Sequence, residues 1–142
     1  MIALPKVKLP ALKSRAIRAY VPLEHDVQVA FVRICQLAER ATMPLLRLGF
    51  AVPNGGQRSK AVAGKLKAEG VRAGVPDWML PVPASGFAGL AIEFKRPGKV
   101  GNTSEAQDTY INDLKAVGWL VVICTCPVAA FDVVKNYLAP AR

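Results

Sequence analysis

The sequence predicts an α/β fold in which a mixed β-sheet is flanked by helices. Segments with apolar residues three and four positions apart, typical of helices, lie on both sides of short apolar runs typical of strands. A helical segment also separates the last two runs, which allows these two strands to pair in parallel. The expected order is helix, strand, helix, strand, strand, helix, strand, helix.

The length of 142 residues fits one domain, expected over residues 23–142, after a basic N-terminal arm at 1–22. The chain has 19 Lys and Arg against 10 Asp and Glu, a net charge of +9. This excess favours a polyanionic partner, because each phosphate that a protein neutralises releases counterions. No apolar run approaches the ~20 residues that span a membrane, so no membrane segment is expected.

The arm has no acidic residue before Glu24. Its composition resembles that of an organellar transit segment, but a basic arm can also contact a phosphate backbone or remain solvated. These three interpretations stay open. Its basic residues are Lys6, Lys8, Lys13, Arg15 and Arg18.

The first helix is expected from about Leu23 to Ala41, with an apolar stripe that includes Val27 and Phe31. Glu24 lies three residues before Val27, on this inward stripe. A carboxylate there needs a partner, for which a metal is one candidate. Alternatively, an acid in the first turn only complements the helix dipole. His25 is interpreted as a surface residue of the same turn.

The next elements are a strand at 48–52 and a helix at 59–69, with three lysines of that helix facing solvent. The glycine-rich turn from Pro53 to Arg58 connects them. Consecutive backbone N–H groups in such a turn can form an anion-binding nest, although this motif alone is weak.

Residues Gly74 to Pro97 place three charges at the ends of two apolar runs. The runs predict strands at 75–80 and 87–94, joined by turn residues. Glu93 and Lys95 then share one strand face, and Asp77 at the neighbouring strand brings a second carboxylate. Two convergent carboxylates indicate a cation, with magnesium the simplest choice. The alternative is an exposed ion pair worth at most about 1 kcal/mol and a Pro-Asp turn.

After a basic loop, Ser104 and Gln107 have the spacing of a capping box, which begins a helix that ends at Gly118. Gln107 also falls on the inward stripe of this helix, so capping and a site role are both compatible with its position. A last strand at 119–125 and a closing helix at 127–138, begun by Pro127, complete the fold.

The three cysteines, Cys35, Cys124 and Cys126, lack the spacing of a metal site. They are expected to be thiols, most simply in a reducing cytoplasm.

These motifs together resemble the PD-(D/E)XK nuclease superfamily, with its restriction-endonuclease-like fold. The residues that carry this resemblance are Val-Pro-Asp77, Ile-Glu93-Phe-Lys95 and Gln107 in the following helix. The chain from Leu23 to Leu138 more narrowly resembles a standalone VRR-NUC domain of the phage or bacterial kind. The further residues that carry this resemblance are Glu24, the Pro-Asn-Gly-Gly turn before Arg58, and Gly-Val-Pro-Asp77. Two features depart from many relatives, Trp78 in place of a small aliphatic residue and the basic arm outside the domain; neither touches a motif carboxylate, and both bear on substrate preference.

The resemblance implies that Asp77 and Glu93 bind Mg²⁺ or Mn²⁺, with the Phe94 carbonyl as a further ligand. Glu24 would complete the acidic cluster, directly or through water. Lys95 would orient or help to deprotonate the attacking water, and Gln107 would position water or phosphate.

The implied function is a metal-dependent, structure-selective DNA endonuclease. It would act as a homodimer on branched DNA such as Holliday junctions, in the cytoplasm of a bacterial or phage-infected cell. The alternative is a non-catalytic basic DNA-binding module on the same fold. In either case a basic rim would hold the DNA backbone through salt-sensitive contacts. Its candidates are Arg58, Lys60, Lys65, Lys67, Arg72, Arg96 and Lys99.

Overall fold

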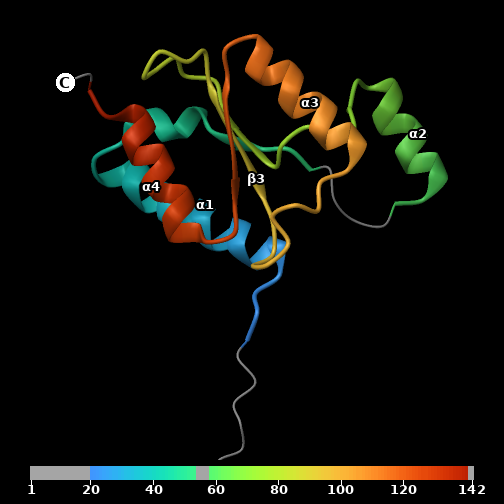
Figure 1. The fold of residues 1–142 in the computed structure, drawn as a ribbon, viewed down its shortest axis with the longest axis horizontal. Helices are drawn as coiled ribbons and strands as arrows, with labels where there is room; N and C mark the ends of the chain where they lie inside the picture. Colours follow the sequence, from blue (N-terminus) through green and yellow to red (C-terminus); the bar gives the residue numbers. More distant parts are fainter. Residues whose placement is uncertain (1–19, 54–57, 141–142) are drawn as a thin grey trace, which may run out of the picture.

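The computed structural model describes residues 20–53 and 58–140. Most of the arm and residues 54–57 of the glycine-rich turn therefore lie outside the described residues, so the anion-binding nest is not tested. The elements follow the expected order, with one short helix added (Figure 1). They are α1 (Glu24–Ala41), η1 (Pro44–Leu48), β1 (Phe50–Ala51), α2 (Lys60–Ala68), β2 (Trp78–Leu80), β3 (Leu90–Phe94), α3 (Glu105–Ala116), β4 (Leu120–Cys124) and α4 (Pro127–Leu138).

The four strands form one mixed sheet in the order β1-β2-β3-β4. The first three strands pair antiparallel, and β4 pairs parallel to β3 after the crossover through α3. The prediction of a mixed sheet whose last two strands are parallel is therefore confirmed. Strand β3 lies between β2 and β4, so its backbone is paired on both sides.

The strands are shorter than the apolar runs predicted. In the run at 48–52, Leu48 ends a 3₁₀ helix, η1, which begins at Pro44, because proline at a first helical position loses no hydrogen bond. In the run at 75–80, Gly74 has a φ of +83° and Pro76 has no N–H to donate, so β2 starts only at Trp78. Phe87 instead closes a tight turn by exchanging backbone hydrogen bonds with Ala84.

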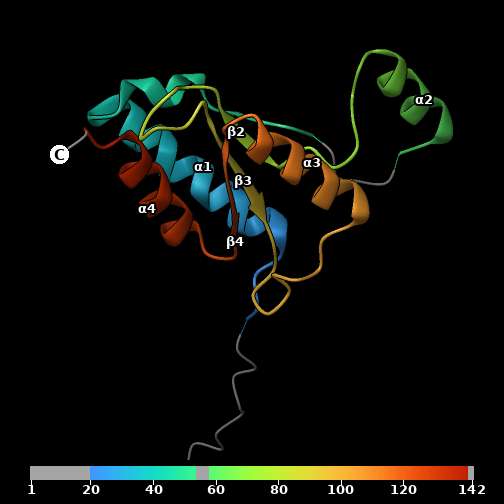
Figure 2. The same cartoon turned by 45° about the horizontal axis from the view of Figure 1, so that its top comes forward.

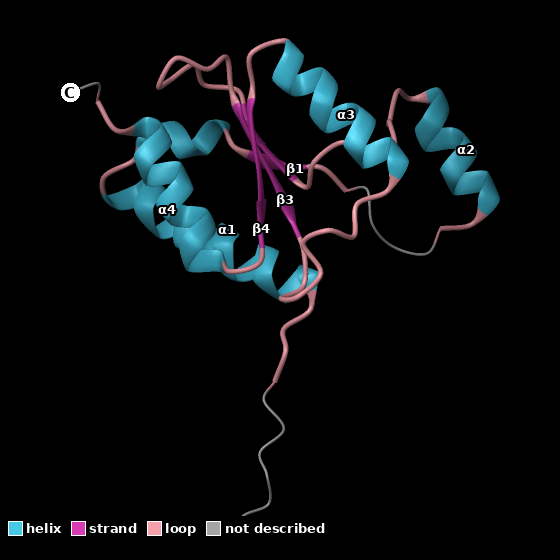
Figure 3. Ribbon diagram, viewed as in Figure 1, coloured by secondary structure: helices cyan, strands magenta, loops and turns pink. Residues whose placement is uncertain are grey.

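Helices cover the two faces of the sheet unequally. Figures 1 and 3 show α1 and α4 together on one face and α3 on the other. Side chains alternate along β3, and the even-numbered Leu90, Ile92 and Phe94 join the main core with α1 and α4. The odd-numbered residues therefore face α3, which sets the position of Glu93.

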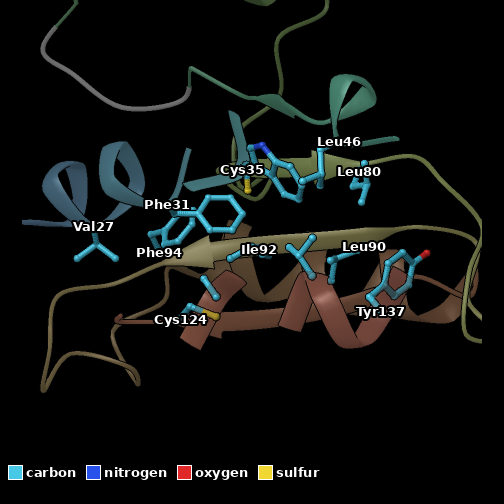
Figure 4. Close-up of a cluster of buried hydrophobic side chains, with 13 residues drawn as sticks. Val27, Phe31, Cys35, Leu46, Leu80, Leu90, Ile92, Phe94, Cys124 and Tyr137 are labelled. Atoms are coloured by element: carbon cyan, nitrogen blue, oxygen red, sulfur yellow. The ribbon is translucent and has the colours of Figure 1, made fainter. Parts of the chain in front are cut away.

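Phe31 of α1 is the centre of the main core (Figure 4). Its ring centroid lies 5.0 Å from that of Trp78 in an edge-to-face arrangement and 5.2 Å from that of Phe94. Trp78 is itself buried, and a Cβ added at Gly49 would lie 2.2 Å from its ring. The aromatic residue after Asp77 thus packs in the core against Phe31 of α1 and against Gly49, which precedes β1.

We expect Phe31→Ala to lower the free energy of unfolding by about 3–5 kcal/mol, because the ring is fully buried. Urea denaturation followed by circular dichroism measures this loss. The control is Leu37→Ala on the same helix, whose side chain is 67% exposed and whose loss should cost no more than about 0.5 kcal/mol. Equal losses in both variants would contradict the central role of Phe31.

Candidate active site

Glu93 and Lys95 form a buried ion pair on the face of the sheet that α3 covers. Their relative exposures are 1% and 5%, and Lys95 Nζ lies 2.8 Å from Glu93 Oε1. The alternation of side chains along β3 brings the two residues together, as the sequence predicted. The burial excludes the interpretation of this motif as an exposed surface ion pair.

Gln107 joins this pair from the first turn of α3. Its Oε1 accepts hydrogen bonds from Lys95 Nζ at 3.3 Å and from the Ser104 backbone N–H at 3.0 Å. Its Nε2 donates to Glu93 Oε1. Ser104 Oγ in turn accepts from the Gln107 backbone N–H at 3.2 Å, which completes the capping box. Gln107 therefore both caps α3 and contacts the buried charges.

Asp77 reaches the same site from the residue before β2. Its Oδ2 accepts a hydrogen bond of 2.8 Å from the Phe94 backbone N–H. Extending the antiparallel register by one residue beyond the Trp78–Ile92 pair places Asp77 opposite Glu93. The predicted convergence of the two carboxylates on neighbouring strands is thus seen in the described structure.

Burial raises the pKa of both carboxyl groups above their ordinary values. For Asp77, desolvation is the main cause, and the Phe94 N–H and the Lys95 charge oppose it. For Glu93, desolvation also dominates, the bond from Lys95 opposes it, and the charge of Asp77 raises the pKa further. The site therefore has an unmet requirement for positive charge when both groups are ionised.

Glu24 does not join these carboxylates directly. Its side chain is exposed at the start of α1, although its charge contributes to the raised pKa of Asp77 and Glu93. Within residues 20–53 and 58–140, no three His, Cys, Asp or Glu side chains are grouped to hold a metal ion. A role for Glu24 through water stays a prediction, as does its action on the helix dipole.

The two oxygens of Glu93 have different environments. Oε1 accepts from both Lys95 and Gln107, whereas Oε2 is buried and has no hydrogen-bond partner in the described part of the chain. A buried carboxylate oxygen without a partner is costly. Together with Asp77 it forms a hard-oxygen donor set of the kind that Mg²⁺ prefers, since this ion needs only one or two carboxylates and keeps several waters. These residues therefore fit a divalent cation.

Gly74 allows α3 to approach the Asp77 segment. Its φ of +83° lies in the left-handed region, and a Cβ there would be 2.1 Å from the Ala106 carbonyl oxygen. Because Ala106 precedes Gln107, this backbone contact places Gln107 beside Glu93. The glycine of the Gly-Val-Pro-Asp motif thus has a structural function in assembling the site.

Gln28 is a site residue that the sequence interpretation missed. Its side-chain Nε2 donates to the Asp77 backbone carbonyl at 3.4 Å, from one turn beyond Glu24 on α1. Its place in the sequence could have indicated this contact. Gln28 lies four residues after Glu24 and three before Phe31, which places it at the edge of the inward stripe of the helix. This contact ties α1 to the segment that carries Asp77.

All seven candidates for the basic rim are exposed, as predicted. They form two groups. Arg96 and Lys99 lie in the loop that follows β3, next to the buried pair. The remainder lie on α2 and its flanking segments, and Arg58 there also donates to the Pro53 carbonyl.

The sequence matches no family model and no curated protein. Among solved structures, the chain is similar to a VRR_NUC domain protein. The two are 26% identical, the match covers 84% of this chain and 90% of the other, and the TM-score is 0.63. The chain therefore shares the fold of a VRR_NUC domain protein. This likeness confirms the resemblance to a VRR-NUC domain and, with it, the α/β class. It also supports a nuclease-like, DNA-binding domain.

No helix within residues 20–53 and 58–140 is long and apolar enough to cross a membrane.

We expect Gly74→Ala to destabilise the fold much more than Gly98→Ala. Both glycines have a positive φ, of +83° and +80°, but nothing lies within 4 Å of a Cβ added at Gly98. Gly98→Ala should therefore cost only the conformational term of about 1–2 kcal/mol, while Gly74→Ala also forces α3 away from β3. Urea denaturation of the two variants compares them, and equal midpoints would contradict the close approach.

The raised pKa values of Asp77 and Glu93 predict a pH effect on the metal-free protein. The folded state retains these protons to higher pH than the unfolded chain, so stability falls as pH rises from the ordinary carboxyl range through the raised pKa values. Asp77→Asn removes the contribution of Asp77 to this pH dependence of stability. Relative to the wild type, this variant should therefore gain stability as pH is raised from about 3 to 7. Denaturation in EDTA across this range measures the difference, and a flat profile would contradict the effect of burial.

Proposed function

We propose that this VRR-NUC domain is a metal-dependent DNA endonuclease that hydrolyses phosphodiester bonds and selects branched DNA by its shape. The observation that carries the proposal is Glu93 Oε2, which has no hydrogen-bond partner among the described residues and is buried beside Lys95 and opposite Asp77. A folded protein keeps such an oxygen only at a cost in stability, and binding of a cation removes that cost. The similarity to a VRR_NUC domain protein supports the same class of chemistry.

Asp77 and Glu93 would hold the ion, Mg²⁺ or Mn²⁺, with the Phe94 carbonyl and Glu24 as the remaining predicted donors. A bound divalent ion makes water nucleophilic near neutral pH and neutralises charge on the attacking and leaving oxygens of a phosphodiester. The Phe94 N–H fixes one oxygen of Asp77. This leaves the orientation of that carboxylate set by the backbone of β3, independently of substrate.

Lys95 supplies a fixed positive charge in a partly dehydrated site. Its ammonium is held between Glu93 Oε1 at 2.8 Å and Gln107 Oε1 at 3.3 Å. A charge positioned in this way needs little reorganisation to stabilise the negative charge that develops on a phosphate. Gln107, already bonded to both members of the pair, fixes the ammonium and the carboxylate relative to each other.

The basic groups would bind the DNA backbone. Arg96 and Lys99 lie next to the catalytic pair, and the lysines of α2 extend the positive surface. The sequence contains no zinc-finger spacing, and the basic side chains are spread over separate elements rather than along one base-reading helix. This favours recognition of DNA shape through phosphate contacts. The free thiols of Cys35, Cys124 and Cys126 support a reducing cytoplasm as the location.

Incubation of the purified protein with linear, flapped and four-way DNA tests the activity. We expect nicking in the presence of Mg²⁺ or Mn²⁺, none in EDTA, and a preference of at least about tenfold for a branched substrate, equivalent to about 1.4 kcal/mol. Binding to all these substrates without any nicking would leave only the alternative, a basic DNA-binding module.

Lys95→Ala and Asp77→Ala should each lower the cleavage rate by about 100-fold or more while DNA affinity stays within a few fold. The measurement is single-turnover cleavage together with fluorescence anisotropy for binding. Lys115→Ala, an exposed lysine in the last turn of α3, is the control and should cleave like the wild type. Unchanged cleavage in Lys95→Ala or Asp77→Ala would remove that residue from the mechanism.

A further inference from the structure

The residues that precede α1 lie at the same end of the sheet as the candidate active site. Strand β3 ends at Phe94, directly after Glu93, and α1 begins at Glu24. Figures 1 and 2 show the start of α1 beside the end of β3 and the loop that follows it. The charge of Glu24 acts on both Asp77 and Glu93. The segment from Tyr20 to Leu23 therefore lies at the edge of the site.

Tyr20 presents its aromatic ring to solvent in this segment. The side chain is 76% exposed, and the neighbouring Val21 and Leu23 are exposed as well. Exposed apolar groups gathered in one place indicate a binding surface. The surface that these three side chains form is too small for a stable protein interface. A nucleobase, in contrast, is a planar ring of similar size to that of tyrosine.

Two features hold the exposed Tyr20 side chain in place. Its hydroxyl donates a hydrogen bond of 2.5 Å to Asp26 Oδ2, which also accepts from the Leu23 backbone N–H at 3.1 Å. Between them, Pro22 fixes its own φ and favours an extended Val21. The bond to Asp26 occupies only the hydroxyl group, so the faces of the ring remain accessible. The ring is thus oriented in advance, which lowers the entropic cost of binding a ligand.

The charges around Tyr20 suit a nucleic acid whose phosphates lie along the basic loop after β3. The hydrogen bond to Asp26 raises the pKa of Tyr20, and the nearby charge of Arg96 opposes this shift. Lys99 is exposed in the same loop as Arg96. Asp26 already accepts two hydrogen bonds at the start of α1, where the helix dipole stabilises its charge. An uncharged base can therefore contact the ring while Arg96 and Lys99 contact phosphates beside it.

We propose that Tyr20 is a specificity-determining residue, on which an unpaired base of the DNA stacks at the edge of the active site. The bases of a continuous duplex are stacked on one another and offer no free face, whereas the bases of a flap do. Stacking accepts every base, because each has a π-face, so it reads the shape of the DNA and not its sequence. The inference rests on the proposed function and names the feature of branched DNA that the site selects.

Fluorescence anisotropy in EDTA, with a flapped DNA and a linear duplex of equal length, tests the inference. We expect Tyr20→Leu to weaken binding of the flapped DNA by about tenfold, equivalent to about 1.4 kcal/mol, and to leave binding of the duplex nearly unchanged. Tyr20→Phe keeps the ring and lacks the hydroxyl, so it should bind like the wild type within a few fold. Circular dichroism verifies that the variants fold.

Phe87→Leu is the matched control. Phe87 is also exposed, at 38%, but it precedes β3 and lies at the end of that strand away from the site. This variant should bind both DNA substrates like the wild type.

A fluorescent adenine analogue placed as the first unpaired base of the flap reports stacking directly. Its emission should be lower in complexes with the wild type and Tyr20→Phe than in the complex with Tyr20→Leu, because stacking on an aromatic ring quenches it. Equal emission in all three complexes overturns the inference. So does a Tyr20→Phe variant that loses as much affinity as Tyr20→Leu, since the bond to Asp26 would then matter instead of the ring. An equal loss on the linear duplex also contradicts it.

Failure of this inference and failure of the nuclease proposal are distinguishable. If Tyr20→Leu binds and nicks flapped DNA as well as the wild type does, only the role of Tyr20 is wrong. If the variant loses its preference for the flap but the wild type never nicks DNA, stacking stands and the nuclease proposal fails. A wild type that binds none of these substrates overturns both.

Discussion

The buried ion pair between Glu93 and Lys95 is the constraint on which the rest of the site depends. Removing two charges from water is costly, and their attraction offsets the cost only when further hydrogen bonds satisfy the remaining groups. Gln107 supplies such bonds to both residues. Within residues 20–53 and 58–140, one oxygen of Glu93 is nevertheless left without a hydrogen-bond partner. The pair therefore combines a positioned ammonium with a carboxylate oxygen that can accept a cation.

The location of this pair follows from the central position of β3. Both of its edges are paired and both of its faces are covered, so every residue of the strand is buried. On one face, Ile92 and Phe94 pack with Phe31 in an apolar core. On the other face, the same backbone presents the charges to α3. A rigid strand with a stable core behind it thus holds the polar site in a fixed geometry.

Close backbone approach joins the elements that complete the site. Gly74 allows the segment before Asp77 to contact the first turn of α3, and Gln28 connects the same segment to α1. By contrast, α2 has almost no such connection to the fold. Contacts between distant segments therefore close the core and the site, whereas α2 buries none of its side chains.

The sequence by itself determined the element order, the parallel last strand pair and the shared face of Glu93 and Lys95, because these follow from local periodicity. It also indicated the capping box at Ser104 and Gln107. Only the tertiary structure decided that the pair is buried, that Gln107 caps and contacts it at once, and that Glu24 is exposed. Burial and the contacts of Gln28 and Gly74 depend on residues far apart in the chain, for which periodicity carries no information. The same holds for α2: its spacing looks amphipathic in sequence, but the described part of the chain buries none of its side chains.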